Sequence, residues 1–203
     1  MNFKIRLSKP EDSEKIIELQ TSSIRVLSSS YNLNQVESLV RSQASARFTQ
    51  NEIGVVAEHE NEIVGFASYL THPSQISGVY VHPSLIRQGI GTRLLKAVEK
   101  IAIDRGYKAI NVFSSLAGVS FYHANGYQSI RQSGFYSEQK TWIPCVILNK
   151  QLITVPIAQQ VYQPPVSLPL GLKPLFPMLF LVTLYLVVVI GPIVVSFIRS
   201  FFR

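Results

Sequence analysis

Cysteine is almost absent from this 203-residue sequence, which contains a single one, Cys145. A lone cysteine excludes an intramolecular disulfide and is typical of a protein from a reducing compartment. Cys145 falls in a predicted strand, where a small buried side chain is a commoner role than a nucleophile. The first residues of the chain also lack the apolar core of a secretory signal peptide, so we expect no secretion.

Acidic side chains are scarce in the later part of the chain. Residues 63–203 contain three Asp or Glu and twelve Lys or Arg. Residues 1–62 contain nine Asp or Glu and seven Lys or Arg. The formal net charge is +7. This positive excess suits a polyanionic ligand and a membrane surface. No Lys/Arg cluster interleaved with aromatic residues is present, which argues against a nucleic-acid partner.

Charge is missing altogether from residues 175–198, a run of 24 residues. A transmembrane helix needs about 20 apolar residues. We therefore expect a soluble domain over 1–152, a Pro-rich linker over 153–174, a membrane helix over 175–198 and a short basic tail over 199–203. The Gly-Pro pair at Pro192 predicts a kink, which also permits a re-entrant helix. A core helix of a second domain is the alternative, but no other segment remains to pack against it.

Apolar periodicity divides the soluble domain into strands and helices. The order is one strand, two helices, three strands, a helix, a strand, a helix and two strands. Such an order predicts an α/β fold with a mixed, mainly antiparallel sheet flanked by helices. The expected strands cover 3–7, 53–58, 63–70, 77–81, 109–113, 127–131 and 141–148. Four helices are expected: one begins near Pro10, one follows a cap on Asn34, and two cover 91–104 and 118–125.

The segment 79–98 is typical of a strand, a tight loop and a helix. Gly89 and Gly91 lie where the helix begins, and the first N–H groups of a helix have no partners within it. The helix dipole is positive at that end, and Arg87 and Arg93 add charge beside it. The pattern predicts a phosphate or pyrophosphate site. It matches neither a dinucleotide fingerprint, since residue 94 is Leu, nor a P-loop, since Gly-Lys-Ser/Thr is absent.

Two motifs together resemble the GNAT superfamily of N-acetyltransferases. Val-His-Pro at 81–83 followed by Gly-Ile-Gly at 89–91 is similar to the family's acetyl-CoA motif. Phe-Tyr-His-Ala-Asn-Gly-Tyr at 121–127 resembles the family's Phe-Tyr-x-x-x-Gly-Phe segment. The resemblance covers about three-quarters of the chain and implies the GNAT fold. One departure is Ile86, which stands where the family usually has Arg or Gln.

The resemblance implies a set of functional residues. It implies acetyl-CoA as co-substrate, an amine as acceptor and no metal. Tyr122 matches the tyrosine that often protonates the leaving thiolate, and Ser115 falls where many relatives have an asparagine that contacts the cofactor. The implied cofactor-binding residues are Val79, Tyr80 and Val81 for the pantetheine arm, and Arg87, Gln88, Gly89, Ile90, Gly91 and Thr92 for the pyrophosphate.

Acetyl transfer requires a neutral amine, although a lysine-type amine has a pKa near ~10.4. Direct attack on the thioester would pass through a tetrahedral intermediate, with no acyl-enzyme. The expected fourth strand carries no acid, so His72 is the best-placed candidate for the general base, ahead of His82, His123 and Glu58. A catalytically weak acyl-CoA-binding module tethered to the membrane is the alternative function. Since acetyl-CoA is cytosolic, we expect the domain on the cytosolic side of a membrane.

Overall fold

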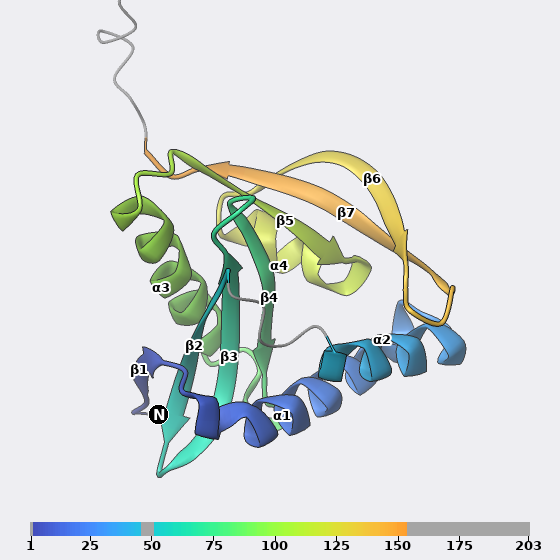
Figure 1. The fold of residues 1–203 in the computed structure, drawn as a ribbon, viewed down its shortest axis with the longest axis horizontal. Coiled ribbons are helices and arrows are strands. Elements are labelled where there is room, and N and C mark those ends of the chain that lie inside the picture. Colours follow the sequence, from blue (N-terminus) through green and yellow to red (C-terminus); the bar gives the residue numbers. More distant parts are fainter. Residues whose placement is uncertain (1, 46–50, 154–203) are drawn as a thin grey trace, which may run out of the picture. The chain divides into compact units, whose positions relative to one another are not determined.

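The computed structural model describes residues 2–45 and 51–153. Within the compact unit Met1–Thr154, seven strands form one sheet in the order β1-β2-β3-β4-β5-β7-β6 (Figure 1). The strands are β1 (Lys4–Leu7), β2 (Glu52–His59), β3 (Glu62–Leu70), β4 (Gln75–Val81), β5 (Ala109–Ser115), β6 (Gln128–Tyr136) and β7 (Trp142–Gln151). The α-helices are α1 (Ser13–Arg25), α2 (Leu33–Ser45), α3 (Ile90–Asp104) and α4 (Val119–Ala124), with short 3-10 turns η1 (Pro10–Asp12), η2 (Val26–Ser29), η3 (Pro83–Leu85) and η4 (Leu116–Gly118). The predicted element order is confirmed.

The sheet is antiparallel except at its centre. β4 and β5 run parallel, and they pair only at Gln75 with Asn111 and at Ile76 with Val112. β4 then continues to Val81 without β5 as a partner, while β3 pairs with it along its length. The open stretch of β4 is the feature of the fold on which the site depends.

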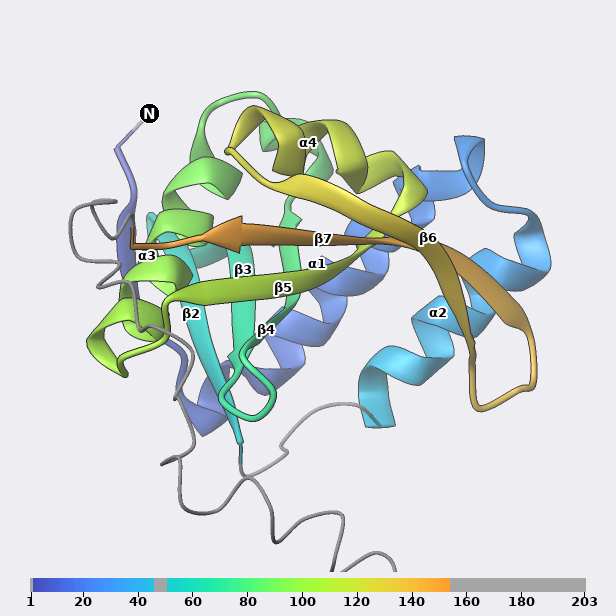
Figure 2. The same cartoon turned by 90° about the horizontal axis from the view of Figure 1, so that it is seen from above.

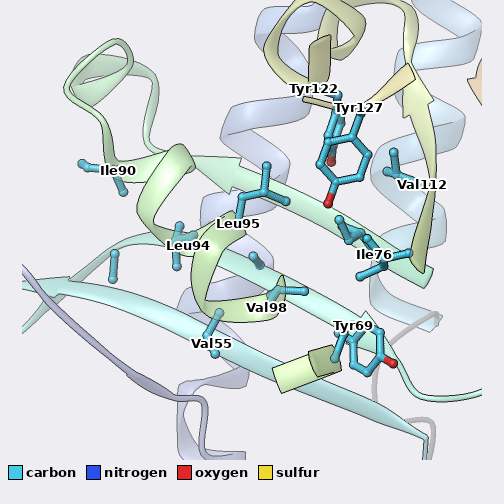
Figure 3. Packing of buried hydrophobic residues seen from close by; sticks show 14 of the residues in the cluster. Val55, Tyr69, Ile76, Ile90, Leu94, Leu95, Val98, Val112, Tyr122 and Tyr127 are labelled. Carbon is cyan, nitrogen blue, oxygen red and sulfur yellow. The ribbon is translucent and has the colours of Figure 1, made fainter. Parts of the chain in front are cut away.

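Helices α1 and α3 pack on opposite faces of the sheet. Neighbouring residues of a strand point to opposite sides, so consecutive apolar residues give the sheet two apolar faces to cover. Val55 of β2 belongs to the large core beneath α3, whereas Val56 packs with Ile16 and Leu19 of α1. Figure 3 shows the α3 side of this core, where Leu94, Leu95 and Val98 face the strands. The residues of that α3 stripe are at most 1% exposed: Ile90, Leu94, Leu95, Val98 and Ala102.

Local sequence determines the turn of the β2–β3 hairpin and the first residue of α2. Glu60 and Asn61 have φ values of 50° and 66°, as a two-residue hairpin loop requires. The predicted cap at Asn34 is wrong, since α2 begins at Leu33 and Asn34 lies within its first turn. Asn32 Oδ1 accepts from the Gln35 N–H (3.0 Å), and Gln35 Oε1 accepts from the Asn32 N–H (3.1 Å). This reciprocal pair needs a three-residue spacing, which only Asn32 has relative to Gln35.

The β6–β7 hairpin is longer than the sequence predicts and reaches α2 (Figure 2). Gln35 Nε2 donates to the Trp142 carbonyl (2.9 Å), and Ser38 Oγ donates to Ser137 Oγ (2.5 Å). The hairpin therefore joins the helical layer at the end of the sheet where β4 is open.

The predicted linker, membrane helix and basic tail lie outside the described residues, except for Ile153. None of the helices in the described ranges is long and apolar enough to cross a bilayer. The prediction for 175–198 stays untested.

Candidate active site

A cavity of about 490 Å³ lies along the stretch of β4 that β5 leaves unpaired. Ser77 to Val81 of β4 and Phe113 to Ser115 of β5 form two of its walls. Most of the remaining lining comes from α1, Tyr31 in the connection before α2, α2 itself, the η4–α4 segment and the β6–β7 hairpin. The cavity is therefore assembled from segments that lie far apart in the sequence.

A β-bulge in β4 shapes the edge that faces this cavity. Ser68 pairs with Gly78 and Tyr69 pairs with Ile76, so Ser77 is an extra residue without an opposite partner in β3. A bulge interrupts the ladder and re-aims backbone groups. After the bulge, the edge of β4 that faces the cavity has N–H and C=O groups that do not bond to β5. Such an edge can pair with an extended ligand that contains amides.

One backbone group on that edge is already contacted by α1. Ser23 Oγ lies 2.9 Å from the Val81 carbonyl and 2.8 Å from the Leu19 carbonyl, and its single proton serves one of them at a time. Ser23 and Val81 both line the cavity. Val79, Tyr80 and Val81, which are predicted to contact the pantetheine arm, line the cavity, but the Val81 carbonyl is partly engaged.

Tyr122 lies on α4, is 5% exposed and lines the cavity. Burial raises the pKa of its phenol above the ordinary tyrosine value, and the neighbouring Tyr80 phenol raises it further. Tyr122 therefore keeps its proton at neutral pH and can donate it within the cavity. Its ring meets Tyr127 edge to face, with centroids 5.3 Å apart (Figure 3).

The loop before α3 has the geometry of an anion cradle. Arg87 and Gly89 have φ values of 65° and 81°, and a Cβ built on Gly89 would meet nothing within 4 Å. The Arg93 N–H bonds to the Gly89 carbonyl (3.1 Å), so the amides of residues 90–92 are those the helix cannot satisfy. The open space over Gly89 and these amides fit a pyrophosphate at the helix start.

The loop adjoins the cavity through Gly91. A Cβ on Gly91 would lie 3.3 Å from Phe121 and 3.5 Å from Val81, and both of these residues line the cavity. The predicted pyrophosphate residues Arg87, Gln88, Gly89, Ile90, Gly91 and Thr92 are not cavity-lining themselves. They border the end of the cavity that Phe121 and Val81 form.

The cationic side chains near this loop are less directed at it than expected. The Arg93 guanidinium lies 4.3 Å above the Phe3 ring, and Ile86 is 54% exposed. Arg87 is exposed and free to approach a bound anion. His82 accepts a hydrogen bond from the Ser84 N–H and so caps η3.

No carboxylate or imidazole occurs among the described residues that line the cavity. His72 lies in the exposed β3–β4 turn, with Nδ1 3.3 Å from Thr71 Oγ1. Glu58 is held by Arg6 through a 2.6 Å ion pair. His123 contacts Ser129 and is exposed. The structure does not bring His72 together with Tyr122, and the titratable lining residues are Tyr31, Tyr80, Tyr122 and Cys145.

Ser115 lines the cavity beside α4, but its hydroxyl already accepts from the Gly118 N–H at 3.2 Å. Within the described ranges, no group of three or more His, Cys, Asp or Glu side chains is placed to hold a metal ion.

Sequence reasoning missed one wall of the cavity. Tyr31, Leu39, Phe135 and Ile143 all line it, and Cys145 is buried beside them. None belongs to a recognisable motif, because each is an ordinary apolar position of its own element. Only the alternation of β7, which puts Ile143 and Cys145 on one face, hints at their shared surface.

Comparison with known families gives a match over most of the domain. The profile described as "Acetyltransferase (GNAT) domain" matches residues 27–148. No curated protein matches the sequence significantly.

Solved structures are similar over the same region. A GCN5-related N-acetyltransferase from Rhodopseudomonas palustris has 26% identity and a TM-score of 0.68, with 74% of this chain and 96% of that chain covered. The PaiA N-acetyltransferase from Thermoplasma acidophilum, solved with coenzyme A, has 21% identity and a TM-score of 0.60 over 74% and 99%. A ribosomal-protein-alanine N-acetyltransferase from Brucella melitensis has 18% identity and a TM-score of 0.52 over 73% and 99%. The last two show likeness of fold alone.

Proposed function

Because this chain belongs to the GNAT family of acetyltransferases, we propose that the amine of its acceptor attacks acetyl-CoA directly, through a tetrahedral intermediate, in the cavity beside β4. The chain is an acetyl-CoA-dependent N-acetyltransferase. The observation that carries the proposed mechanism is the buried Tyr122 phenol in a cavity bordered by the α3 anion cradle.

Each proposed role follows from a group described above. The amides at the start of α3 hold the pyrophosphate. The open edge of β4 pairs with the pantetheine arm, and an N–H group near the bulge at Ser77 faces the developing oxyanion. Tyr122 gives its proton to the leaving thiolate, and its raised pKa keeps that proton available at neutral pH.

The cavity itself provides the deprotonated amine in this proposal. Burial disfavours the charged form of an ammonium and lowers its pKa. The described lining contains no carboxylate to oppose that effect. His72 stays a prediction as general base, and it would need to act from outside the lining.

The tail supplies the proposed location. Residues 175–198 are long and apolar enough to anchor the chain in a membrane, after a linker over 153–174. Acetyl-CoA is cytosolic, so the domain of residues 1–152 would lie on the cytosolic side.

Two measurements test the proposed activity on the full chain. Calorimetric titration with CoA measures binding, and release of free thiol from acetyl-CoA measures transfer to a panel of amines. Binding and transfer together are the expected result. Binding without transfer to any amine would favour the alternative, a tethered acyl-CoA-binding module, to which the exposed Ile86 and the lack of a lining base also point.

A further inference from the structure

The cavity has two chemically different ends. One end reaches Phe121 and Val81, next to the anion cradle of α3. The other end is formed by residues that pack together between α1, α2 and β7, including Ile24, Tyr31 and Ile143. With acetyl-CoA entering from the cradle, the second end is left for the acceptor.

The acceptor end is apolar and its side chains are buried against one another. Ile24, Tyr31 and Ile143 are 2%, 6% and 1% exposed, and Leu39 packs against them. Phe135 pairs with Ile143 across the β6–β7 hairpin and completes this wall. Phe135 is 42% exposed, so it lies at the mouth of the cavity.

The polar groups of this wall are already engaged. The Tyr31 hydroxyl donates to the Pro144 carbonyl (2.8 Å) and accepts from the Leu116 N–H (3.0 Å). One lone pair of this hydroxyl is left to accept from an ammonium, and it carries no charge to balance one. No carboxylate lines the cavity within the described part of the chain.

One positively charged side chain, Arg131, is placed near this wall. Arg131 lies on the same strand face as Phe135, and its field lowers the pKa of the Cys145 thiol, against the larger opposing effect of burial. A second ammonium on an acceptor would thus lose its water against an apolar wall and meet a guanidinium instead of a counter-ion.

We infer that the acceptor is a monoamine whose amino group is carried on an apolar or aromatic body, and that polyamines and other polycationic amines are rejected. The inference rests on the proposed acetyl transfer. Phe135 is the specificity-determining residue, because it lines the cavity and is exposed at its mouth, and Ile143 packs behind it.

A matched pair of probes tests the inference on the full chain in a non-ionic detergent. Hexylamine and 1,6-diaminohexane have the same six-carbon chain and differ by one terminal ammonium, and 2-phenylethylamine adds an aromatic probe. We expect kcat/KM to be about 100-fold higher for hexylamine than for the diamine, with 2-phenylethylamine at least equal to hexylamine.

Substitution of Phe135 makes the test specific to this wall. Phe135→Glu supplies the missing counter-ion and should reduce the preference for hexylamine about tenfold, whereas the uncharged Phe135→Gln should change it less than about threefold. Binding of CoA to each variant, measured by calorimetry, checks that the domain is folded.

The outcomes separate the inference from the function beneath it. Equal or faster transfer to the diamine overturns the inference and leaves acetyl transfer in place. Binding of acetyl-CoA without transfer to either apolar amine overturns the inference too. Absence of both CoA binding and transfer overturns the proposed function, and the inference with it.

Discussion

The Tyr122 ring meets the Tyr127 ring edge to face, with centroids 5.3 Å apart and an interplanar angle of 69°. The Tyr127 hydroxyl in turn donates to Glu99 Oε1 at 2.9 Å, and Glu99 is paired with Lys150. Tyr122, the proposed proton donor, thus packs against the Tyr127 ring, and the buried Glu99 carboxylate holds Tyr127 in place. The two tyrosines therefore connect the cavity lining to the buried Glu99–Lys150 pair.

Tyr122→Phe keeps this ring contact and removes the phenolic proton. We expect kcat to fall by about 10- to 1,000-fold, since general acid catalysis contributes on the order of 10²–10⁴. The affinity for CoA should stay nearly unchanged, because the ring still packs. Steady-state kinetics together with calorimetry measure both quantities, and an unaltered kcat under conditions where chemistry limits the rate would eliminate the role.

The pH dependence of kcat follows from the direction of the same pKa. Burial raises the Tyr122 pKa, so the protonated, donating form persists beyond the ordinary tyrosine value of ~10. The wild type should lose no activity through this group between neutral pH and about pH 10. A loss of kcat centred near pH 8 that disappears in Tyr122→Phe would contradict the assignment.

Gly89→Val tests the anion cradle. Gly89 has φ +81°, which a β-branched residue tolerates poorly, so the loop should shift and CoA should bind about tenfold more weakly, or about 1.4 kcal/mol. Gly106→Val is the matched control, since Gly106 has φ +82°, open space over its Cα and a place after the other end of α3. Equal losses of CoA affinity in the two variants would move the site away from this loop.

The Glu99–Lys150 pair should matter more than a surface pair of the same kind. Lys150→Ala leaves a carboxylate that is 11% exposed without its cation and should cost about 1–3 kcal/mol of unfolding free energy. Lys100→Ala breaks an exposed pair with Asp104 and should cost less than about 0.5 kcal/mol. Denaturant unfolding followed by the fluorescence of Trp142, the sole tryptophan, gives both values, and equal costs would mean that the burial of Glu99 is unimportant.

Cys145, the sole cysteine, reports on occupancy of the cavity. It is 3% exposed, and burial raises its thiol pKa, so alkylation by iodoacetamide should be slow at neutral pH and accelerate as pH rises. Acetyl-CoA should slow it further by filling the cavity. Arg131→Ala removes a positive charge that favours the thiolate and should reduce the alkylation rate about two- to threefold. Lys140→Ala on the same hairpin should leave the alkylation rate unchanged. If acetyl-CoA left the alkylation rate of Cys145 unchanged, the ligand would bind outside this cavity.

The membrane prediction rests on composition and has its own test. More than a dozen Leu, Ile, Val and Phe residues occupy 175–198, and each favours insertion by ~0.3–0.6 kcal/mol at the centre of a helix. The full chain should stay with membranes through high-salt and carbonate washes. Aspartates at Val187 and Val189 should release it, at ~2.5–3.5 kcal/mol each, and extraction of the unaltered chain by carbonate would show that the segment is no anchor.

The resemblance to the GNAT motifs singled out Tyr122. Local signals in the sequence determined the order of elements and the glycine loop before α3. Each depends on interactions within a few residues: alternation, helical spacing, the left-handed backbone of a turn, or a helix end. A single sequence is enough to predict them because the interacting residues are close together along the chain.

Tertiary structure decided the rest. β6 continues to Tyr136 because β7 pairs with it, although residues 132–134 are Gln, Ser and Gly and have weak strand preference. Arg93 lies over Phe3 instead of facing the loop, and α2 begins at the Asn32–Gln35 pair. The apolar acceptor wall joins residues more than a hundred positions apart, such as Tyr31 and Ile143. No local pattern encodes such a surface, since its composition arises only when the packing of helices on the sheet brings those side chains together.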